Sequence, residues 1–294
     1  MSFFVRFWGV RGSIPTPGHR TARYGGNTPC VEVRINGTRF ICDGGTGIRG
    51  LGTQLLEQAS GAPISLHLLF SHAHWDHIQG FPFFAPAYVP STRITVYGAR
   101  EGDTRMYRLL NGQQNSDYFP VSFADLGARI EPGHLGDGQR VIDGVTVSSM
   151  PVSHPGGCTA FAFEWEGRKV VYATDHELDL VFTNRARVQS DRSVLRRPPP
   201  DLVAFCKGAD LLVCDGQYTE AEYPNHEGWG HSRATSATDL AIISDARRLA
   251  IFHHDPMQSD DDVDAKVDAC RARVDLMHGH TQVFAAREGI EIKV

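Results

Sequence analysis

One stretch decides how this chain is interpreted: Phe70-Ser71-His72-Ala73-His74-Trp75-Asp76-His77-Ile78-Gln79-Gly80. An apolar run typical of a strand ends at Ser71, and four potential metal ligands follow within six positions. In a loop that ends a strand, ligands two apart can face one side, and later residues can turn back toward the same point. Imidazole and carboxylate groups together suit zinc, iron or manganese. Three histidines and an aspartate packed this closely are costly to bury without a metal ion, so the stretch predicts a metal site.

The sequence resembles the metallo-β-lactamase fold superfamily, whose signature His-x-His-x-Asp-His is matched without a gap by His72 to His77. The resemblance extends over nearly the whole chain. It includes an Asp-Gly motif within Ile41–Gly47, a lone histidine at His154, a strand-ending aspartate at Asp175 and a late histidine in Ala250–Pro256. The resemblance implies an α/β fold, a four-layer αββα sandwich of the metallo-β-lactamase type, formed by residues 1–294 as a single hydrolase domain.

The resemblance also implies how the ligands divide. His72, His74 and His154 would hold one metal ion, and Asp76, His77 and His253 the other, with Asp175 bridging the two. Two metal ions about 3.5–4 Å apart need a shared carboxylate to offset their repulsion, and Asp175 stands where an apolar strand meets a polar turn. His254 is the alternative to His253, which we prefer because it directly follows the strand. We expect two divalent ions, with Zn²⁺ first and Mn²⁺ or iron also compatible with these ligands.

The remaining histidines lack potential ligands beside them in the sequence. We expect surface or core positions for six of them: His19, His67, His134, His226, His278 and His280. His176 adjoins Asp175, so a place in the cleft and a place away from it both stay open.

Composition is ordinary for a soluble globular protein, with 41% apolar and 21% charged residues in 294. The net charge of −5 argues against a protein that coats nucleic acids in general. The six cysteines show no Cys-x-x-Cys pair, so we expect buried, reduced thiols. The sequence shows no basic leader followed by a long apolar run and no apolar stretch of about 20 residues, so we predict a cytoplasmic protein with no membrane partner.

Apolar patterning predicts strands and helices in mixed order, typical of helices packed outside two sheets. The predicted strands are Phe3–Trp8, Cys30–Ile35, Arg39–Cys42, Ser65–Phe70, Gly144–Pro151, Ala160–Glu166, Lys169–Ala173, Leu211–Cys214 and Leu249–Phe252. The predicted helices are Gly50–Ala59, Ser232–Ala246 and Asp262–Ala272. Asn36-Gly37 predicts a hairpin. The arginine-rich segment Thr183–Asp201 is interpreted as a solvated surface loop, with a basic substrate rim as the alternative.

The motif Gly230-His231-Ser232 indicates which branch of the superfamily the sequence resembles. It looks like the pattern of the phosphodiesterase branch, which includes the tRNA 3′-end endonuclease RNase Z, where the matching histidine assists cleavage near the leaving group. The opening Phe7–Pro15 also looks like a bacterial subgroup of this branch. We therefore assign catalytic roles to Asp76 and His231, with His231 as the general acid. The alternative is that His231 has no catalytic role and only neighbours the residue that caps a helix. A metal-bridging hydroxide would attack phosphorus in line.

The substrate is predicted from one difference between this chain and the RNase Z proteins. RNase Z proteins carry a long tRNA-gripping arm between the positions that match His154 and Asp175, whereas only 21 positions separate those residues here. This argues against tRNA and favours a small phosphodiester such as a cyclic nucleotide. An RNA nuclease, a thioester or lactam hydrolase of the same fold, and a metal-bound scaffold without activity stay as alternatives. The sequence is compatible with a homodimer.

Overall fold

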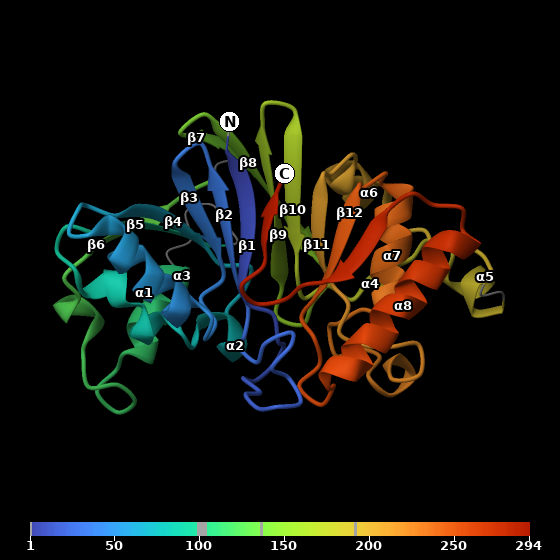
Figure 1. The fold of residues 1–294 in the computed structure, drawn as a ribbon, viewed down its shortest axis with the longest axis horizontal. Coiled ribbons are helices and arrows are strands. Elements are labelled where there is room, and N and C mark those ends of the chain that lie inside the picture. Colours follow the sequence, from blue (N-terminus) through green and yellow to red (C-terminus); the bar gives the residue numbers. More distant parts are fainter. Residues whose placement is uncertain (1, 99–104, 136–137, 191–192) are drawn as a thin grey trace.

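The computed structural model describes residues 2–98, 105–135, 138–190 and 193–294. They form two seven-stranded sheets that pack face to face, with helices on the outer side of each (Figure 1). This arrangement confirms the predicted four-layer α/β sandwich.

The first sheet has the strand order β14-β1-β2-β3-β4-β5-β6. Its strands are β1 (Phe3–Gly9), β2 (Cys30–Ile35), β3 (Thr38–Cys42), β4 (Ser65–Leu69), β5 (Arg93–Tyr97), β6 (Arg129–Gly133) and β14 (Glu291–Lys293). The strands from β3 to β6 run parallel, so their carboxyl ends lie along one edge. Helices α1 (Ile48–Ala59) and α3 (Arg105–Gln113) lie outside this sheet, and the short α2 (Trp75–Ile78) follows β4 (Figure 1).

The second sheet has the strand order β13-β12-β11-β10-β9-β8-β7. Its strands are β7 (Gln139–Ile142), β8 (Val145–Val152), β9 (Cys158–Trp165), β10 (Arg168–Ala173), β11 (Leu211–Asp215), β12 (Arg248–Phe252) and β13 (Gln282–Ala285). Strands β10 to β13 are parallel. Its helices are α4 (Leu178–Val181), α5 (Arg185–Ser190), α6 (Pro200–Cys206), α7 (Ala234–Ile243) and α8 (Asp260–Leu276). Single 3₁₀ turns occupy Phe81–Phe83, Ala85–Tyr88, Phe123–Asp125 and Tyr223–Asn225.

The apolar pattern that predicted these elements corresponds to the positions that are buried in the structure. Strand β1 alternates buried and half-buried positions, as expected when one face meets the core. The β2–β3 hairpin turns at Asn36-Gly37, where both residues have positive φ (46° and 94°) and so suit a tight hairpin turn. All the strands and helices predicted from the sequence are present, with most ends shifted by about two residues or less, the scatter expected for element boundaries.

Three apolar clusters fill the space between the layers. Phe7 and Val33 of the first sheet meet Phe163 and Tyr172 of the second between the sheets. Leu51 and Leu55 of α1 cover the outer face of the first sheet, and α7 and α8 cover the second. All six cysteines are free and buried in these layers, as predicted. Among the described residues, every helix is too short or too polar to span a membrane.

The interpretation of Thr183–Asp201 as a solvated loop was wrong in part. The segment contains α5 and the first residues of α6, and Arg196 is only 7% exposed. Its guanidinium bonds Glu220 of the loop after β11 at 2.5 Å and approaches Asp239 of α7 at 3.4 Å. Arg187 and Arg197 are exposed as predicted, whereas Arg192 lies outside the described residues.

Candidate metal centre and active site

The predicted ligands come together where the carboxyl ends of the two sheets' central strands meet. His72, His74, Asp76 and His77 lie in the loop and helix α2 that follow β4. His154, Asp175 and His253 follow β8, β10 and β12 of the other sheet. The site is therefore formed by residues from both sheets.

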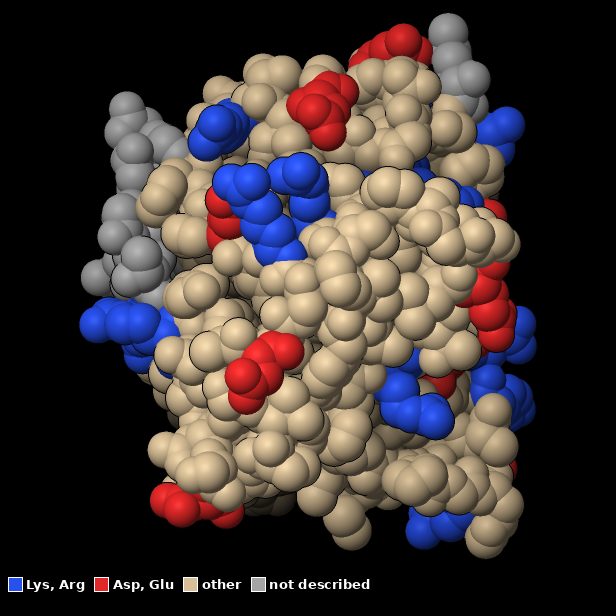
Figure 2. All heavy atoms as spheres, turned by 90° about the vertical axis from the view of Figure 1, so that its left-hand side faces the viewer, with Lys and Arg blue, Asp and Glu red and all other residues tan. Residues whose placement is uncertain are grey.

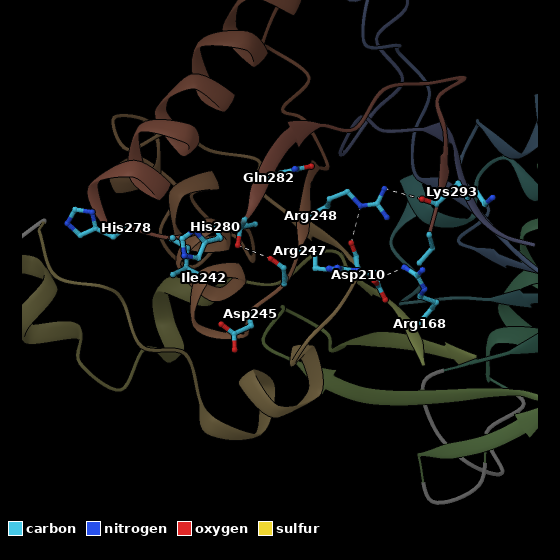
Figure 3. Close-up of a pocket in the computed structure, with 14 residues that line it drawn as sticks. Arg168, Asp210, Ile242, Asp245, Arg247, Arg248, His278, His280, Gln282 and Lys293 are labelled. Carbon is cyan, nitrogen blue, oxygen red and sulfur yellow. Dashed lines mark hydrogen bonds and ion pairs between the residues drawn. The ribbon is translucent and has the colours of Figure 1, made fainter. Parts of the chain in front are cut away.

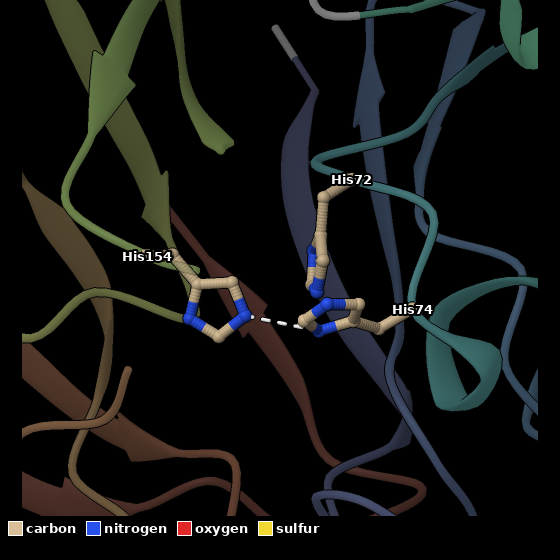
Figure 4. A group of neighbouring side chains, drawn as sticks. All are labelled: His72, His74 and His154. Atoms are coloured by element: carbon tan, nitrogen blue, oxygen red, sulfur yellow. Dashed lines mark hydrogen bonds between the residues drawn. The ribbon is translucent and has the colours of Figure 1, made fainter. Parts of the chain in front are cut away.

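A first group consists of His72, His74 and His154 (Figure 4). Nε2 of His154 lies 3.0 Å from Nδ1 of His74, and the rings of His72 and His154 are 4.8 Å apart between centroids. His154 donates its other ring N–H to the carbonyl oxygen of Gly230 at 2.8 Å. Such a bond fixes the ring and leaves the lone pair of Nε2 facing the group, as metal-ligating histidines usually do.

A second group consists of Asp76, His77 and His253. Nε2 of His253 lies 3.2 Å from Oδ2 of Asp76 and 3.3 Å from Nε2 of His77. Both imidazoles use Nδ1 elsewhere: His77 donates to Asp43 at 2.8 Å, and His253 donates to the side-chain oxygen of Gln217 at 3.0 Å. Their Nε2 atoms are thus the ones presented to a shared point.

Asp175 lies between the two groups. Its carboxylate oxygens are 3.3 Å from His77, 3.4 Å from His253, 3.6 Å from His72 and 3.9 Å from His154. Its carboxylate can therefore reach both groups at once, which is the position that a bridging ligand needs.

The donor set fits divalent metal ions. Nε2 of His72 is buried and finds no hydrogen-bond partner among the described residues, although it points into the first group. A buried, unpaired ring nitrogen is unfavourable unless something binds it. Imidazole nitrogens and carboxylate oxygens suit zinc, manganese and iron alike, so the ligands do not single out one metal.

Burial and close packing shift the pKa values of the candidate ligands. Burial, together with repulsion from His77, holds the pKa of His72 well below its usual value. Burial opposes the charged form of Asp175, but the surrounding histidines outweigh it and hold the pKa of that carboxyl well below its usual value. Asp175 is thus an anion and His72 a neutral imidazole, the forms in which each binds metal.

Asp43 supports the ligands without joining them. It is fully buried and accepts hydrogen bonds from His77, from the backbone N–H and hydroxyl of Ser71, and from the hydroxyl of Tyr172. Asp43, Asp175 and His253 all have positive φ (64°, 45° and 58°). Non-glycine residues rarely adopt this conformation, and it is characteristic of functional sites.

His231 lies against the same cluster. Its Nδ1 donates to Oδ2 of Asp215 at 2.7 Å, and its ring stacks on His253 with 4.7 Å between centroids. Burial opposes its charged form, but Asp215, Asp175 and Asp76 together raise the pKa of His231 to about 9. Asp215 is thus placed to stabilise a protonated imidazole beside the candidate metal centre.

The structure distinguishes the remaining histidines. His254 is buried and donates to the carbonyl oxygen of Ala286 at 2.9 Å, on the side away from the cluster, which favours His253. His176 is buried and belongs to none of the metal-compatible groups among the described residues. The six histidines expected elsewhere also lie outside those groups: His19, His67, His134, His226, His278 and His280.

Sequence reasoning missed two residues of this site. Asp215 ends β11 as Asp175 follows β10, and strand-ending position was the available signal. It groups with Asp175, His231 and His253 among the clusters that could hold a metal ion, although its bond to His231 indicates a supporting role. Asp43 stood within the expected Asp-Gly motif, but its contacts to Ser71 and His77 depend on the pairing of β3 with β4.

Comparison with known proteins agrees with this geometry. The family model described as "Beta-lactamase superfamily domain" matches residues 38–254. The chain belongs to this family. Ribonuclease Z of Natronomonas pharaonis is 24% identical over 288 residues, covering 86% of this chain and 87% of the relative.

Solved structures give the same fold for this beta-lactamase superfamily member. The metallo-beta-lactamase fold protein YhfI from Bacillus subtilis superposes with a TM-score of 0.67 at 17% identity, covering 99% of both chains. The short form of human tRNase Z superposes with a TM-score of 0.63 at 17% identity, covering 98% of both. The resemblance to the RNase Z-like branch is confirmed, and the chain is a metal-dependent hydrolase of the superfamily.

Proposed function

We propose that this hydrolase cleaves a small phosphodiester, such as a cyclic nucleotide, with two divalent metal ions. His72, His74 and His154 would hold one ion, Asp76, His77 and His253 the other, and Asp175 would bridge them. When bound, two such ions stabilise negative charge on phosphoryl oxygens and activate a water molecule. Zn²⁺ is the first expectation, with Mn²⁺ or iron compatible with the same ligands.

The observation that carries the proposal is the pair His231–Asp215. With Nδ1 donating to Asp215, the ring nitrogen left to give a proton is Nε2. Asp215 stabilises the protonated imidazole that a general acid requires, and Asp175 at 4.0 Å places the ring beside the candidate metal ligands. An alkoxide leaving group needs such a proton, whereas the thiolate released from a thioester leaves readily without one.

The space beside the ligands supports a small substrate. A pocket of about 290 Å³ adjoins His72 and His74 and is lined by Met106, Leu109 and Val152. This volume lies at the lower end of the range of small-molecule sites. Between His154 and Asp175 the chain forms only the β9–β10 hairpin, with no room for an arm.

Replacement of His231 tests the proposal through its dependence on the leaving group. We expect His231→Ala to lower turnover of 2′,3′-cyclic AMP by about 10²–10⁴-fold, because an alkoxide leaves poorly without a proton. The loss with bis-p-nitrophenyl phosphate should be smaller, since p-nitrophenolate leaves readily. The metal content should stay unchanged.

His226→Ala is the matched control, because His226 stacks on Tyr218 near the site but is outside the cluster. Equal losses on both substrates, or loss of both metal ions, would contradict a general acid at His231. Two bound metal ions with no diesterase activity on either substrate would instead favour the thioester or scaffold alternatives.

RNA cleavage is the second candidate, and one observation favours it: the curated relatives are ribonucleases Z, matched over 86% of this chain. On the face turned to the viewer in Figure 2, Lys and Arg side chains form small separate groups interspersed with Asp and Glu. The described part of this face therefore shows no continuous basic surface of the kind that follows a nucleic-acid backbone.

The two candidates are separated by comparing the turnover of their substrates. The metal-loaded protein is incubated with a precursor tRNA that carries a 3′ trailer and, separately, with cyclic nucleotides. We expect kcat/KM to be higher for a cyclic nucleotide. Efficient removal of the trailer would reverse the order of the two candidates.

A further inference from the structure

A second pocket lies at the opposite ends of the strands that carry the candidate site. Asp175, Asp215 and His253 stand at the carboxyl ends of β10, β11 and β12, whereas the pocket is lined by residues at the amino ends of the same strands. At about 3.3 Å per residue, these strands separate the two places by roughly 15–20 Å. The pocket is therefore distinct from the metal centre.

The pocket has a volume of about 860 Å³, enough for a nucleotide. Basic groups dominate its ionic lining: Arg168, Arg247, Arg248 and Lys293, against Asp210 and Asp245. Asp245 is paired with Lys207. Asp210 is thus the side-chain carboxylate of the lining that faces the arginines.

Asp210 holds the arginines together. Its Oδ1 accepts from Arg168 at 3.4 Å and from Arg247 at 3.0 Å, and its backbone carbonyl accepts from Nε of Arg248 at 3.1 Å. Its other oxygen accepts from the backbone N–H of Lys169 at 2.9 Å. The Asp210 carboxylate thus holds two guanidinium groups and its backbone carbonyl a third, which leaves an excess of positive charge.

The excess charge remains available to a ligand. The side chains of Arg168 and Arg247 stay 50% and 69% exposed, so both remain accessible at the pocket that they line. Burial, together with repulsion from Arg247 and Arg168, lowers the pKa of Arg248. An anion bound among these groups would relieve that repulsion, and guanidinium groups bind phosphate in a bidentate manner.

The other side of the pocket has a different character. Figure 3 shows Arg168, Arg248 and Lys293 gathered on one side and His278 on the other, with His280 and Ile242 between them. Imidazole rings and an aliphatic side chain offer planar and apolar contact to a flat aromatic group. The lining therefore has two parts, with cations for phosphate and with rings and an aliphatic side chain for a base.

We propose that this pocket binds a nucleotide, with its phosphates on Arg168, Arg247 and Arg248 and its base toward Ile242, His278 and His280. The site is independent of the metal centre and of the substrate cleaved there.

The test is calorimetric titration of the metal-loaded protein with α,β-methylene-ADP, which resists hydrolysis, and with pyrophosphate and adenosine as partial ligands. We expect Arg168→Gln/Arg247→Gln to weaken binding of the ADP analogue by about tenfold or more, since two charge-assisted contacts are lost. Turnover of bis-p-nitrophenyl phosphate should stay at the wild-type level, because neither arginine belongs to the metal centre.

Arg129→Gln/Arg271→Gln is the matched control, since it removes two arginines that are exposed to a similar degree and ion-paired elsewhere. It should bind the analogue like the wild type. Unchanged affinity in the Arg168/Arg247 variant, or an equal loss in the control, would overturn the site. Pyrophosphate binding as tightly as the ADP analogue would overturn the assignment of a nucleotide.

Discussion

His154 shows how closely single residues define the candidate site. Its ring lies between Nδ1 of His74 and the carbonyl oxygen of Gly230. Gly230 has φ of 92°, and a Cβ there would stand 2.3 Å from Nδ1 of His154. Glycine is therefore required at this position both for its backbone conformation and for the space it leaves.

We expect Gly230→Ala to displace the His154 ring and to lower metal affinity by about 10–100-fold, the usual effect of disturbing a residue that orients a ligand. Gly228→Ala is the matched control: its φ is 88°, but a Cβ there meets nothing within 4 Å. Metal content by mass spectrometry and diesterase turnover measure both variants. If the two lose metal to the same extent, backbone strain rather than the contact with His154 explains the effect.

At the residue scale, the candidate ligands could be proposed from the sequence because they are close in the chain or follow apolar strands. His72 to His77 lie within six positions, and His154, Asp175 and His253 each follow a strand. The supporting residues could not be predicted in the same way. Asp215 is 16 positions from its partner His231, and Asp43 is 34 positions from His77, so only the folded sheets bring them together.

At the scale of elements, helix α8 reaches the site through one buried lysine. Lys266 is 2% exposed and donates to the backbone carbonyl of Gln217 at 3.1 Å and to the side chain of Gln258 at 2.7 Å. Gln217 in turn accepts from His253. Burial lowers the pKa of Lys266 from 10.5 to about 8.

This shift predicts a dependence of stability on alkaline pH. Between pH 8 and 10.5 the amine is mostly neutral in the folded protein but still protonated in the unfolded chain, so the unfolded chain binds more protons and stability rises with pH. The free energy of unfolding of the wild type, minus that of Lys266→Met, should rise by up to about 3 kcal/mol across this window. Denaturant titrations at several pH values measure it; a constant difference would contradict the shift.

Elements were predicted where apolar residues repeat and missed where they do not. Strand β6 is largely exposed and contains Pro132, so nothing in its pattern indicates a strand until it pairs with β5. Arg196 looked solvated for a similar reason. Its partners Glu220 and Asp239 are 24 and 43 positions away, and their approach depends on how α7 and the loop after β11 pack.

At the scale of the whole molecule, the candidate metal centre joins the two sheets. Four of its residues follow β4 of the first sheet, and His154, Asp175 and His253 belong to the second. A metal ion bound to both sets would resist their separation, and any ligand that binds only the folded state stabilises it.

We therefore expect chelation to lower the melting temperature and renewed Zn²⁺ to restore it. At a free metal concentration a thousandfold above Kd, each ion contributes about 4 kcal/mol to the free energy of unfolding. Calorimetry with and without a chelator measures the difference. An unchanged melting temperature, with metal loss confirmed by elemental analysis, would show that the two sheets hold together without the ions.

The six buried cysteines allow unfolding of the molecule to be followed by thiol labelling. All are inaccessible, and burial raises the pKa of each thiol, for example Cys206 to about 12 and Cys270 to about 11. A thiol-reactive dye should therefore leave the native protein unlabelled and label it as it opens, because only exposed thiolates react. Since the cysteines are distributed over both sheets and α6 and α8, the order in which they become labelled would reveal which layer opens first.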